Sequence, residues 1–344
     1  MKKINGTKCP YIIAEAGVNH NGQLATALEL VKAAHGAGAD CIKFQAFTAE
    51  ELVVKNAEKA QYQKRSGPKG ESQYDMLQRL ELKESEFAAI KKYCDELEID
   101  FLVTSFSPRW VRAFYEMGVT AFKIGSGNLD DIDLLKAIGQ THLPVIISTG
   151  MSELNEVDRA LTILRKYGSE QIAVLHCVSL YPTQLEQANL SAVKTIAEHT
   201  HLPTGFSDHT EELITGALAV AAGAVILEKH FTLDKKMEGP DHRMSLEPEE
   251  LTEYIRLARQ AGKACGDGQK KPLTAEEKMK ETVRMSVVAA TFIKAGTKIT
   301  PEMITIKRPG TGIPAEQMDV VINTTASRDI EPGHIINRND LITL

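Results

Sequence analysis

Residues 145–177 read VIISTGMSELNEVDRALTILRKYGSEQIAVLHC and contain one full repeat of the pattern that decides the fold. The run 145–149 is apolar and β-branched, which is typical of a buried strand. Residues 153–167 then place apolar side chains at the spacing of one helix face, and 173–177 is a second apolar run. A helix between two such runs predicts parallel strands, because parallel neighbours need a crossover connection.

The same alternation recurs through the first 265 residues. Helical segments are predicted between the strands, among them 24–35, 84–97, 108–117, 153–167, 211–222 and 248–265. Eight runs are predicted as strands: 11–15, 41–45, 101–105, 121–125, 145–149, 173–177, 204–208 and 225–230. Eight alternations predict a (β/α)8 TIM barrel in the α/β class. The alternative is a doubly wound open sheet, but GVNHNG at 17–22 does not match the dinucleotide fingerprint that such a sheet would carry.

Each predicted strand becomes polar at its C-terminal end. In a closed barrel all eight of these ends lie on one rim, where the active sites of this fold are found. We therefore expect the terminal residues to converge on one cavity: Glu15, Lys43 with Gln45, Thr104, Lys123 with Ser126, Ser148 with Thr149, His176, Asp208 with His209, and Glu228 with His230.

Lys43 and Lys123 stand within otherwise apolar runs. A lysine in a buried strand is costly unless it meets an anion, so the pair indicates a site for phosphate or carboxylate. The alternative is that each lysine extends to the rim and reaches water. The small residues of Gly-Ser-Gly (125–127) and Ser-Thr-Gly (148–150) would let backbone amides approach the same anion.

His209 and His230 end consecutive predicted strands, so their imidazoles are able to share one metal ion. Two histidines do not complete a zinc site, and an open ion such as Mn²⁺, Mg²⁺ or Co²⁺ fits better. Asp241 is a nearby candidate for the substrate or for the waters of the metal. Glu15 is a candidate general base, and the alternative for it is a structural ion pair with Lys43 or Lys123.

Composition excludes several classes of protein. The 344 residues carry a net charge of −6, which does not suggest nucleic-acid binding. We also expect no membrane span, because no apolar run approaches the roughly 20 residues needed. The N-terminus lacks the apolar stretch of a signal peptide, and the five cysteines are scattered without metal spacing. These features predict a cytoplasmic enzyme.

The chain divides into three parts by pattern. We assign 1–265 to the barrel, 266–283 to a linker with at most one exposed helical turn, and 284–344 to a small β-rich domain. Within the last part, the segment 293–304 resembles 330–341, with Ile-x-x-Gly-x-x-Ile kept at an offset of 37 residues. The repeat predicts a pseudo-symmetric β domain in which both glycines occupy turns with positive φ.

Several motifs together resemble the sialic acid synthases. They occur in the family's order and span nearly the whole chain: IIAEAGVNHNG (12–22), IKFQ (42–45), FKIGSG (122–127), STGM (148–151), HCVSLYPT (176–183), FSDHT (206–210), EKHFT (228–232), EGPD (238–241) and, in the family's antifreeze-like (SAF) domain, IKRPGTG (306–312).

The resemblance implies condensation of phosphoenolpyruvate with an N-acetylmannosamine-type sugar to give a nine-carbon 2-keto acid and phosphate. It implies a divalent metal, Mn²⁺ first, on residues matching His209 and His230, and a base matching Glu15. Gln45 and Asp241 would hold the sugar or the metal waters. It also implies a domain-swapped homodimer in which Arg308 of one protomer reaches the partner's sugar. The phosphoenolpyruvate site would comprise Lys43, Thr104, Lys123, Ser126, Ser148, Ser179 and Tyr181.

One position departs from the family. Many members carry an acidic residue, thought to touch the sugar, where this chain has Asn128. The accepted sugar therefore stays open between N-acetylmannosamine and a 6-deoxy 2,4-diacetamido analogue for legionaminic acid. A second enzyme hypothesis is a keto-octulosonate- or heptulosonate-type condensation on a sugar phosphate. A third hypothesis, outside enzymes, is a non-catalytic carbohydrate-binding protein.

Overall fold

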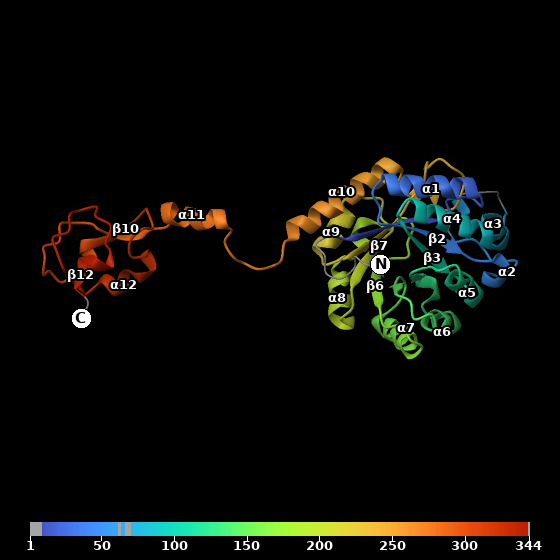
Figure 1. Cartoon of the computed structure of the whole chain (residues 1–344), viewed down its shortest axis with the longest axis horizontal. Helices are drawn as coiled ribbons and strands as arrows, with labels where there is room; N and C mark the ends of the chain where they lie inside the picture. The colour runs from blue at the N-terminus through green and yellow to red at the C-terminus, as the bar shows by residue number, and fades with distance from the viewer. Residues whose placement is uncertain (1–8, 61–62, 66–69, 343–344) are drawn as a thin grey trace. The chain divides into compact units, whose positions relative to one another are not determined.

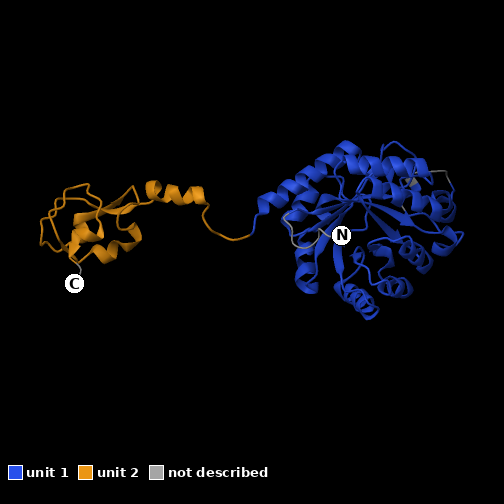
Figure 2. Cartoon of the chain, in the orientation of Figure 1, with its two compact units in different colours: residues 1–267 blue, residues 268–344 orange. Residues whose placement is uncertain are grey.

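The computed structural model describes residues 9–60, 63–65 and 70–342. The chain forms two compact units, residues 1–267 and 268–344 (Figure 2). Each unit has its own hydrophobic core. No helix in the described part of the chain is long and apolar enough to cross a membrane.

Unit 1 is a closed barrel of eight parallel strands in sequence order, with β8 pairing back to β1, which confirms the predicted fold. All eight predicted strands are present. Their bounds are β1 Tyr11–Gly17, β2 Cys41–Ala46, β3 Asp100–Ser105, β4 Phe122–Ile124, β5 Val145–Ser148, β6 Ile172–Cys177, β7 Thr204–Asp208 and β8 Ile226–His230.

Helices surround the strands (Figure 1). They are α1 Leu24–Gly36, α2 Ala49–Leu52, α3 Gln73–Leu80, α4 Glu84–Glu96, α5 Pro108–Glu116, α6 Ile132–Gly139, α7 Leu154–Lys166, α8 Ser191–Thr200, α9 Thr215–Ala221 and α10 Pro248–Cys265. Short 3-10 turns lie at η1 Gln63–Arg65, η2 Ser126–Asn128, η3 Leu185–Gln187 and η4 His242–Met244. The helix predicted at 211–222 begins later, at Thr215, whose hydroxyl bonds the Asp208 carboxylate.

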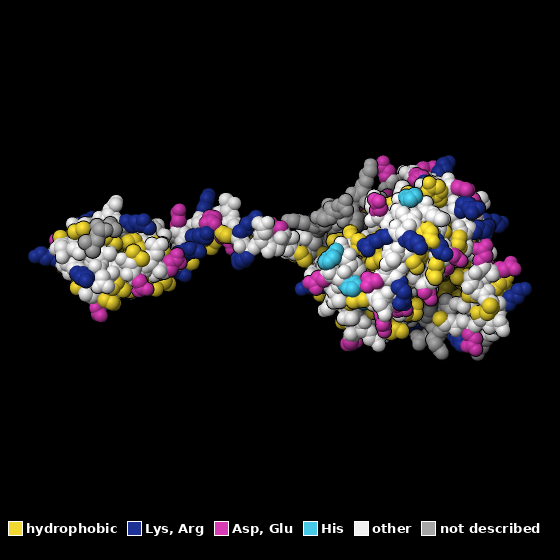
Figure 3. Space-filling model, turned by 90° about the horizontal axis from the view of Figure 1, so that it is seen from below, with side chains coloured by type: hydrophobic (Ala, Val, Ile, Leu, Met, Phe, Trp, Pro, Cys, Tyr) yellow, Lys and Arg dark blue, Asp and Glu magenta, His cyan; other side chains and the backbone are white. Residues whose placement is uncertain are grey.

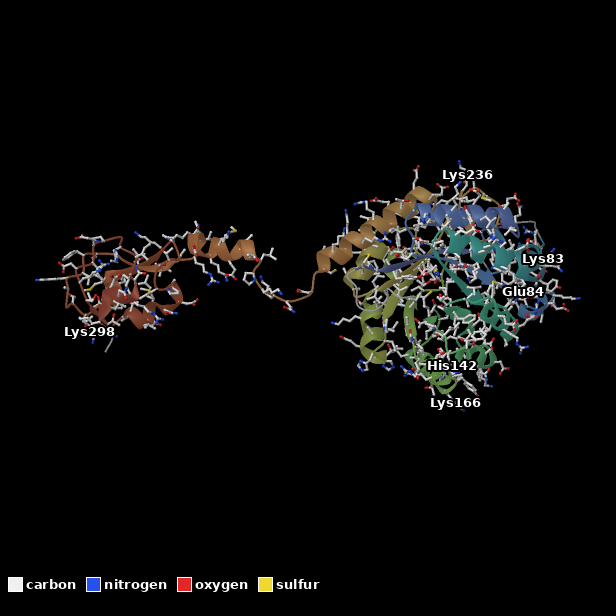
Figure 4. All side chains as sticks on the ribbon, viewed as in Figure 1. Lys83, Glu84, His142, Lys166, Lys236 and Lys298 are labelled. Carbon is white, nitrogen blue, oxygen red and sulfur yellow. The ribbon has the colours of Figure 1, made fainter. Side chains whose placement is uncertain are left out.

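Side chains alternate between the inside and the outside of the barrel along each strand. Outward residues pack with the helices in the main core, and the outermost charged side chains, such as Lys83, Lys166 and Lys236, point away from it (Figure 4). Acidic and basic side chains are interspersed on the face of unit 1 seen in Figure 3. Inward residues near the strand starts fill the barrel with apolar side chains: Tyr11, Ile13, Cys41, Leu102, Ala121, Ile146, Ala173, Leu175 and Ile226.

Unit 2 begins with a helix that the sequence did not predict. The segment 266–283 was expected to contain at most one helical turn, but α11 spans Thr274–Val283. The Glu276 carboxylate accepts the Leu273 amide at 2.7 Å, which caps its first turn. The helix buries no residue, so the apolar spacing that reveals most helices is missing here.

The rest of unit 2 has the predicted internal symmetry. Its elements are β9 Ser286–Ala289, η5 Pro301–Met303, β10 Ile304–Lys307, η6 Ala315–Gln317, α12 Met318–Val321, β11 Thr325–Ala326, η7 Arg338–Asp340 and β12 Leu341–Ile342. The two copies of the repeat meet at Ile293 and Ile330, which exchange backbone hydrogen bonds of 2.9 and 2.8 Å. Gly296 and Gly333 have φ of 80° and 83°, as the repeat predicted.

Candidate active site

A cavity of about 470 Å³ opens at the C-terminal ends of the strands in unit 1. All eight strands, or the loops that follow them, contribute to its wall. Of the residues predicted for the site in unit 1, these line it: Glu15, Lys43, Gln45, Thr104, Lys123, Ser126, Asn128, Ser148, Ser179, Tyr181, His209, His230 and Asp241.

Three of the strand-end residues expected in the cavity face outward instead. Thr149 donates its hydroxyl to the Leu175 carbonyl at 3.0 Å, His176 bonds the Ala188 carbonyl at 2.9 Å, and Asp208 pairs with Lys229 at 3.1 Å. The expectation was wrong for these residues because a shift of one position along a strand reverses the side of the barrel.

Residues one position before or after these three face the cavity. Ser148, Cys177 and Ser207 line it, as does Glu228, two positions before His230 on the same strand. Cys177 and Ser207 were not selected from the sequence, whereas Glu228 was among the strand-end residues expected in the cavity, and it does line the cavity. Counting two positions back from His209 would have found Ser207, and Cys177 lies one position beyond the outward-facing His176.

The two lysines are buried in one network of charges. Lys43 Nζ lies 3.0 Å from Glu15 Oε2 and donates to Thr104 Oγ1 at 3.0 Å. Lys123 Nζ donates to Ser148 Oγ at 2.5 Å. Glu228 Oε1 lies 3.6 Å from Lys43 Nζ and 3.8 Å from Lys123 Nζ, so it joins the two lysines.

This geometry decides whether the lysines reach water and whether Glu15 is only a structural partner. Neither lysine extends to water, since both are almost fully buried. Glu15 does form an ion pair with Lys43, and it also lines the cavity and accepts Gln45 Nε2 at 2.8 Å. The ion pair therefore does not remove Glu15 from the site.

Burial and neighbouring charge set the protonation of these groups. Burial raises the pKa of Glu15 above its usual value even though Lys43 opposes the shift. Burial alone would raise the pKa of Glu228, but Lys123 and Lys43 lower it overall. Burial lowers the pKa of Lys123, whereas Glu15 and Glu228 outweigh burial at Lys43 and raise its pKa. Burial and the Glu15 charge raise the pKa of Asp241 to about 7. Asp241 is thus suited to exchange protons near neutral pH, and Glu15 holds its proton to a higher pH than an exposed glutamate does.

Small residues open the wall beside the lysines. The Gly150 amide donates to Ser126 Oγ at 2.9 Å. A Cβ atom on Gly150 would overlap the Ser179 hydroxyl and press on Ser126 and Cys177. The glycine therefore lets the backbone approach these hydroxyls, which is what an anion site needs.

The two histidine rings lie next to each other in the cavity wall. Their ring centroids are 5.5 Å apart, and the Tyr181 ring lies 4.2 Å from that of His209. His209 Nδ1 lies 2.7 Å from the Val178 carbonyl, to which it donates, so the lone pair resides on Nε2. His230 Nδ1 is buried and has no hydrogen-bond partner within the described residues.

These donors fit an open divalent metal site. Among the described residues no group of three or more His, Cys, Asp or Glu side chains could hold a metal ion. Two imidazoles with available ring nitrogens leave the other coordination positions to water or substrate, which suits Mn²⁺ or Mg²⁺ better than structural zinc. The remaining predicted residue, Arg308, is exposed on unit 2.

The comparisons with known proteins cover both units. Residues 30–270 match the model of the NeuB family, and residues 284–342 match the SAF domain. An N,N'-diacetyllegionaminic acid synthase of Legionella pneumophila is 40% identical over 343 residues, covering 96% of each chain. The enzyme of the same name from Campylobacter jejuni is 40% identical over 94% of this chain and 98% of its own.

A solved structure gives the same result. The N-acetylneuraminic acid (sialic acid) synthetase of Leptospira borgpetersenii, in complex with citrate, has a TM-score of 0.71 at 35% identity. The alignment covers 79% of this chain and 90% of that one. With its barrel, its cavity and its C-terminal SAF domain, this chain belongs to the NeuB family.

Proposed function

We propose that the chain is a nonulosonate synthase that condenses phosphoenolpyruvate with an N-acyl hexosamine and releases phosphate. Relatives named N,N'-diacetyllegionaminic acid synthase, pseudaminic acid synthase and N-acetylneuraminate-9-phosphate synthase support the class. The observation that carries the proposal is one cavity lined by two buried lysines and two imidazoles. The lysines suit a small polyanion, and the imidazoles suit a metal that binds the second substrate.

In this proposal Lys43 and Lys123 neutralise the phosphate and carboxylate of phosphoenolpyruvate. Hydroxyl groups already bonded to the lysines, or next to them, would donate to the same oxygens. These groups are Thr104, Ser126, Ser148, Ser179 and Tyr181. Glu228 would keep both ammonium groups in place through its contacts of 3.6 and 3.8 Å.

His209 and His230 would hold the divalent ion, with Mn²⁺ proposed first and Mg²⁺ or Co²⁺ as alternatives. When bound, such an ion supplies Lewis acidity toward the aldehyde of the open-chain sugar. Tyr181 lies over the His209 ring and limits how far that ring can turn. Gln45 and Asp241 are close enough to Glu15 to order water or a sugar hydroxyl beside it.

The bond changes balance without a redox partner. The methylene carbon of phosphoenolpyruvate forms a C–C bond to the aldehyde carbon, and the aldehyde oxygen gains a proton. Water adds to C2 of the former enol and gives up one proton, which balances the proton gained by the aldehyde oxygen. The C2–O bond to phosphate then breaks as the new C2 hydroxyl becomes the keto group, and the hydroxyl proton leaves with the phosphate. Glu15, whose pKa is raised by burial, would take the proton from that water.

The cavity wall favours a sugar without a second phosphate. Lys43 and Lys123 are the only lysine or arginine side chains among the described residues of the wall. Asn128 lines the wall as a neutral amide. Next to these groups the wall is apolar, formed by Val18, Phe47, Leu52, Val53, Met76, Leu77, Leu80 and Phe106. Such a surface suits the methyl groups of a 6-deoxy 2,4-diacetamido sugar.

Arg308 and a homodimer belong to the proposal through the resemblance. In it, Arg308 of one protomer reaches the N-acyl group of the sugar bound by its partner. The side chain is exposed on unit 2 and so is available for such a contact.

A substrate panel tests the proposal. The full chain is incubated with phosphoenolpyruvate, Mn²⁺ and one of three sugars: N-acetylmannosamine, its 6-phosphate, or the 6-deoxy 2,4-diacetamido analogue. We expect one phosphate for each sugar consumed, a product with the mass of both substrates plus one water less phosphoric acid, and the highest rate with the diacetamido sugar.

The controls separate the competing hypotheses. His209→Ala should abolish turnover, whereas His35→Ala, at an exposed position in α1, should retain it. Turnover of the 6-phosphate alone would favour a sugar-phosphate condensation. Sugar binding in calorimetry without any phosphate release would favour a non-catalytic carbohydrate-binding protein. Full activity of His209→Ala would contradict the metal assignment.

A further inference from the structure

Two charged side chains stand on the outer face of the barrel directly behind the histidines. Along the eight described strands, outward-facing residues beyond the first position are apolar or uncharged, with two exceptions, Asp208 on β7 and Lys229 on β8. The strand register pairs Asp208 with Lys229, and their charged atoms lie 3.1 Å apart. Each residue immediately precedes one of the two histidines.

The Asp208 carboxylate receives further hydrogen bonds from three residues. Its Oδ1 accepts the amide and hydroxyl of Thr210 at 2.9 and 2.8 Å. Its Oδ2 accepts the Thr215 hydroxyl at 2.5 Å and the Tyr254 hydroxyl at 3.1 Å. Thr215 begins α9 and Tyr254 lies in α10, so the carboxylate links β7 to both helices.

The lysine completes the same cluster. Lys229 Nζ donates to the Thr210 carbonyl at 2.5 Å and lies 5.5 Å from the centre of the Tyr254 ring. Any side chain at position 216 in α9 would overlap that ring, so Gly216 makes the room that Tyr254 occupies. All five members of the cluster, Asp208, Thr210, Thr215, Lys229 and Tyr254, are essentially inaccessible to solvent.

The cluster holds the backbone on both sides of His209. Asp208 precedes the histidine and Thr210 follows it, and both are bonded within the cluster. Lys229 is the residue directly before His230, and its place in the cluster fixes the backbone there. On the other side, the His230 carbonyl accepts the Leu246 amide at 2.9 Å. The cluster therefore controls the backbone positions from which the His209 and His230 side chains extend.

Stability does not explain a buried ion pair at this place. Apolar residues of similar volume usually stabilise a protein core as well as a buried pair does, or better. Burial in fact lowers the pKa of Lys229, because removing water costs more than the Asp208 charge returns. What the pair supplies is directional bonding that fixes two strand ends relative to each other.

We propose that Asp208, Thr210, Thr215, Lys229 and Tyr254 form a positioning cluster that sets the separation of His209 and His230 from behind the barrel wall. The inference rests on the proposed function, in which these histidines bind a divalent metal. The cluster residues are positioning residues, since they would touch neither substrate nor metal.

The test compares two tyrosines that each bond an aspartate. Tyr254→Phe removes the hydroxyl that bonds Asp208, behind the histidines. Tyr11→Phe is the matched control, since it removes a hydroxyl bonded to Asp100 at 2.5 Å near the opposite ends of the strands. Thr215→Val is a second, smaller change within the cluster. The Mn²⁺ dissociation constant of the full chain is measured by electron paramagnetic resonance, and phosphoenolpyruvate binding is measured without metal.

We expect Tyr254→Phe and Thr215→Val to weaken Mn²⁺ binding by about tenfold, in the range seen for outer residues of metal sites. Phosphoenolpyruvate binding should not change, and Tyr11→Phe should bind Mn²⁺ like the unmodified protein. Equal Mn²⁺ affinity in all variants would overturn the inference, as would an equal loss in Tyr11→Phe. If the unmodified protein binds no Mn²⁺, the metal assignment itself is wrong and the inference falls with it.

Discussion

Substituting Asp208 should destabilise the protein more than substituting Lys229, although the two residues form one ion pair. Asp208→Ala leaves the Lys229 ammonium, 1% exposed, with the Thr210 carbonyl as its one remaining hydrogen-bond partner in the described residues. Lys229→Met leaves the carboxylate with four donors: the amide and hydroxyl of Thr210 and the hydroxyls of Thr215 and Tyr254. The aspartate substitution should therefore lower the free energy of unfolding by more than the lysine substitution.

The magnitudes follow from the number of groups left unpaired. Breaking a buried ion pair from one side costs about 3–5 kcal/mol, and we place Asp208→Ala near about 4 kcal/mol. We place Lys229→Met at about half of that, because the remaining charge keeps its hydrogen bonds. The double variant leaves neither charge buried alone, so its loss should be smaller than the sum by about 2 kcal/mol.

The assay uses the single tryptophan of the chain. Trp110 is buried in α5, so its fluorescence reports the unfolding of unit 1 alone. Urea titrations of the unmodified protein, the two single variants and the double variant complete a double-mutant cycle. The thermal unfolding midpoint should fall by about 8–16 °C for Asp208→Ala. The reasoning would be refuted if the double variant lost the sum of the two single losses in free energy of unfolding to within about 0.4 kcal/mol. It would also be refuted if Lys229→Met lost more than Asp208→Ala.

Three further outcomes are expected. Gly150→Ala should weaken phosphoenolpyruvate binding at least about tenfold, since its methyl group overlaps the Ser179 hydroxyl. Gly36→Ala in α1, which has open space around it and does not line the cavity, is the calorimetric control, and equal affinities of the two variants would contradict the crowding argument. Burial lowers the pKa of His20 to about 4 from 6.5, so the unfolded chain binds a proton between these values that the folded chain does not. Stability should thus fall as pH drops from 6.5 to 4, by up to about 3 kcal/mol. His20→Asn should flatten that slope in urea titrations, and an unchanged slope would remove His20 as its cause. Arg308→Ala should raise the KM for the sugar while leaving that for phosphoenolpyruvate within about twofold, and an unchanged sugar KM would contradict the role proposed for Arg308.

The barrel could be predicted from sequence because its signal is repeated. Eight apolar runs separated by helical spacing leave few possible arrangements, and the structure forms all eight strands. The helix α11 could not be predicted in this way, since a helix that buries nothing has no apolar face to detect. Its evidence is local, in the Glu276 carboxylate that caps it.

The site was predictable by position but only in part by side chain. Glu15, Lys43, Lys123, His209 and His230 reach the cavity because each occupies an inward position. His176 and Asp208 have chemistry equally suited to a site, yet they occupy outward positions. Residue type cannot separate the two groups. Only the register of each strand does so, and a strand of five residues gives little sequence evidence for its register.

The pairing of β1 with β8 affects how the protein is made. Glu15 lies opposite His230 in that register, so the carboxylate and the imidazole come from distant points in the chain. A ribosome that has released only the first seven strands has made a sheet with two open edges, which invites aggregation. Catalytic competence would therefore begin only after residue 230 emerges, and a chaperone that shields β1 until then would raise the yield of active enzyme.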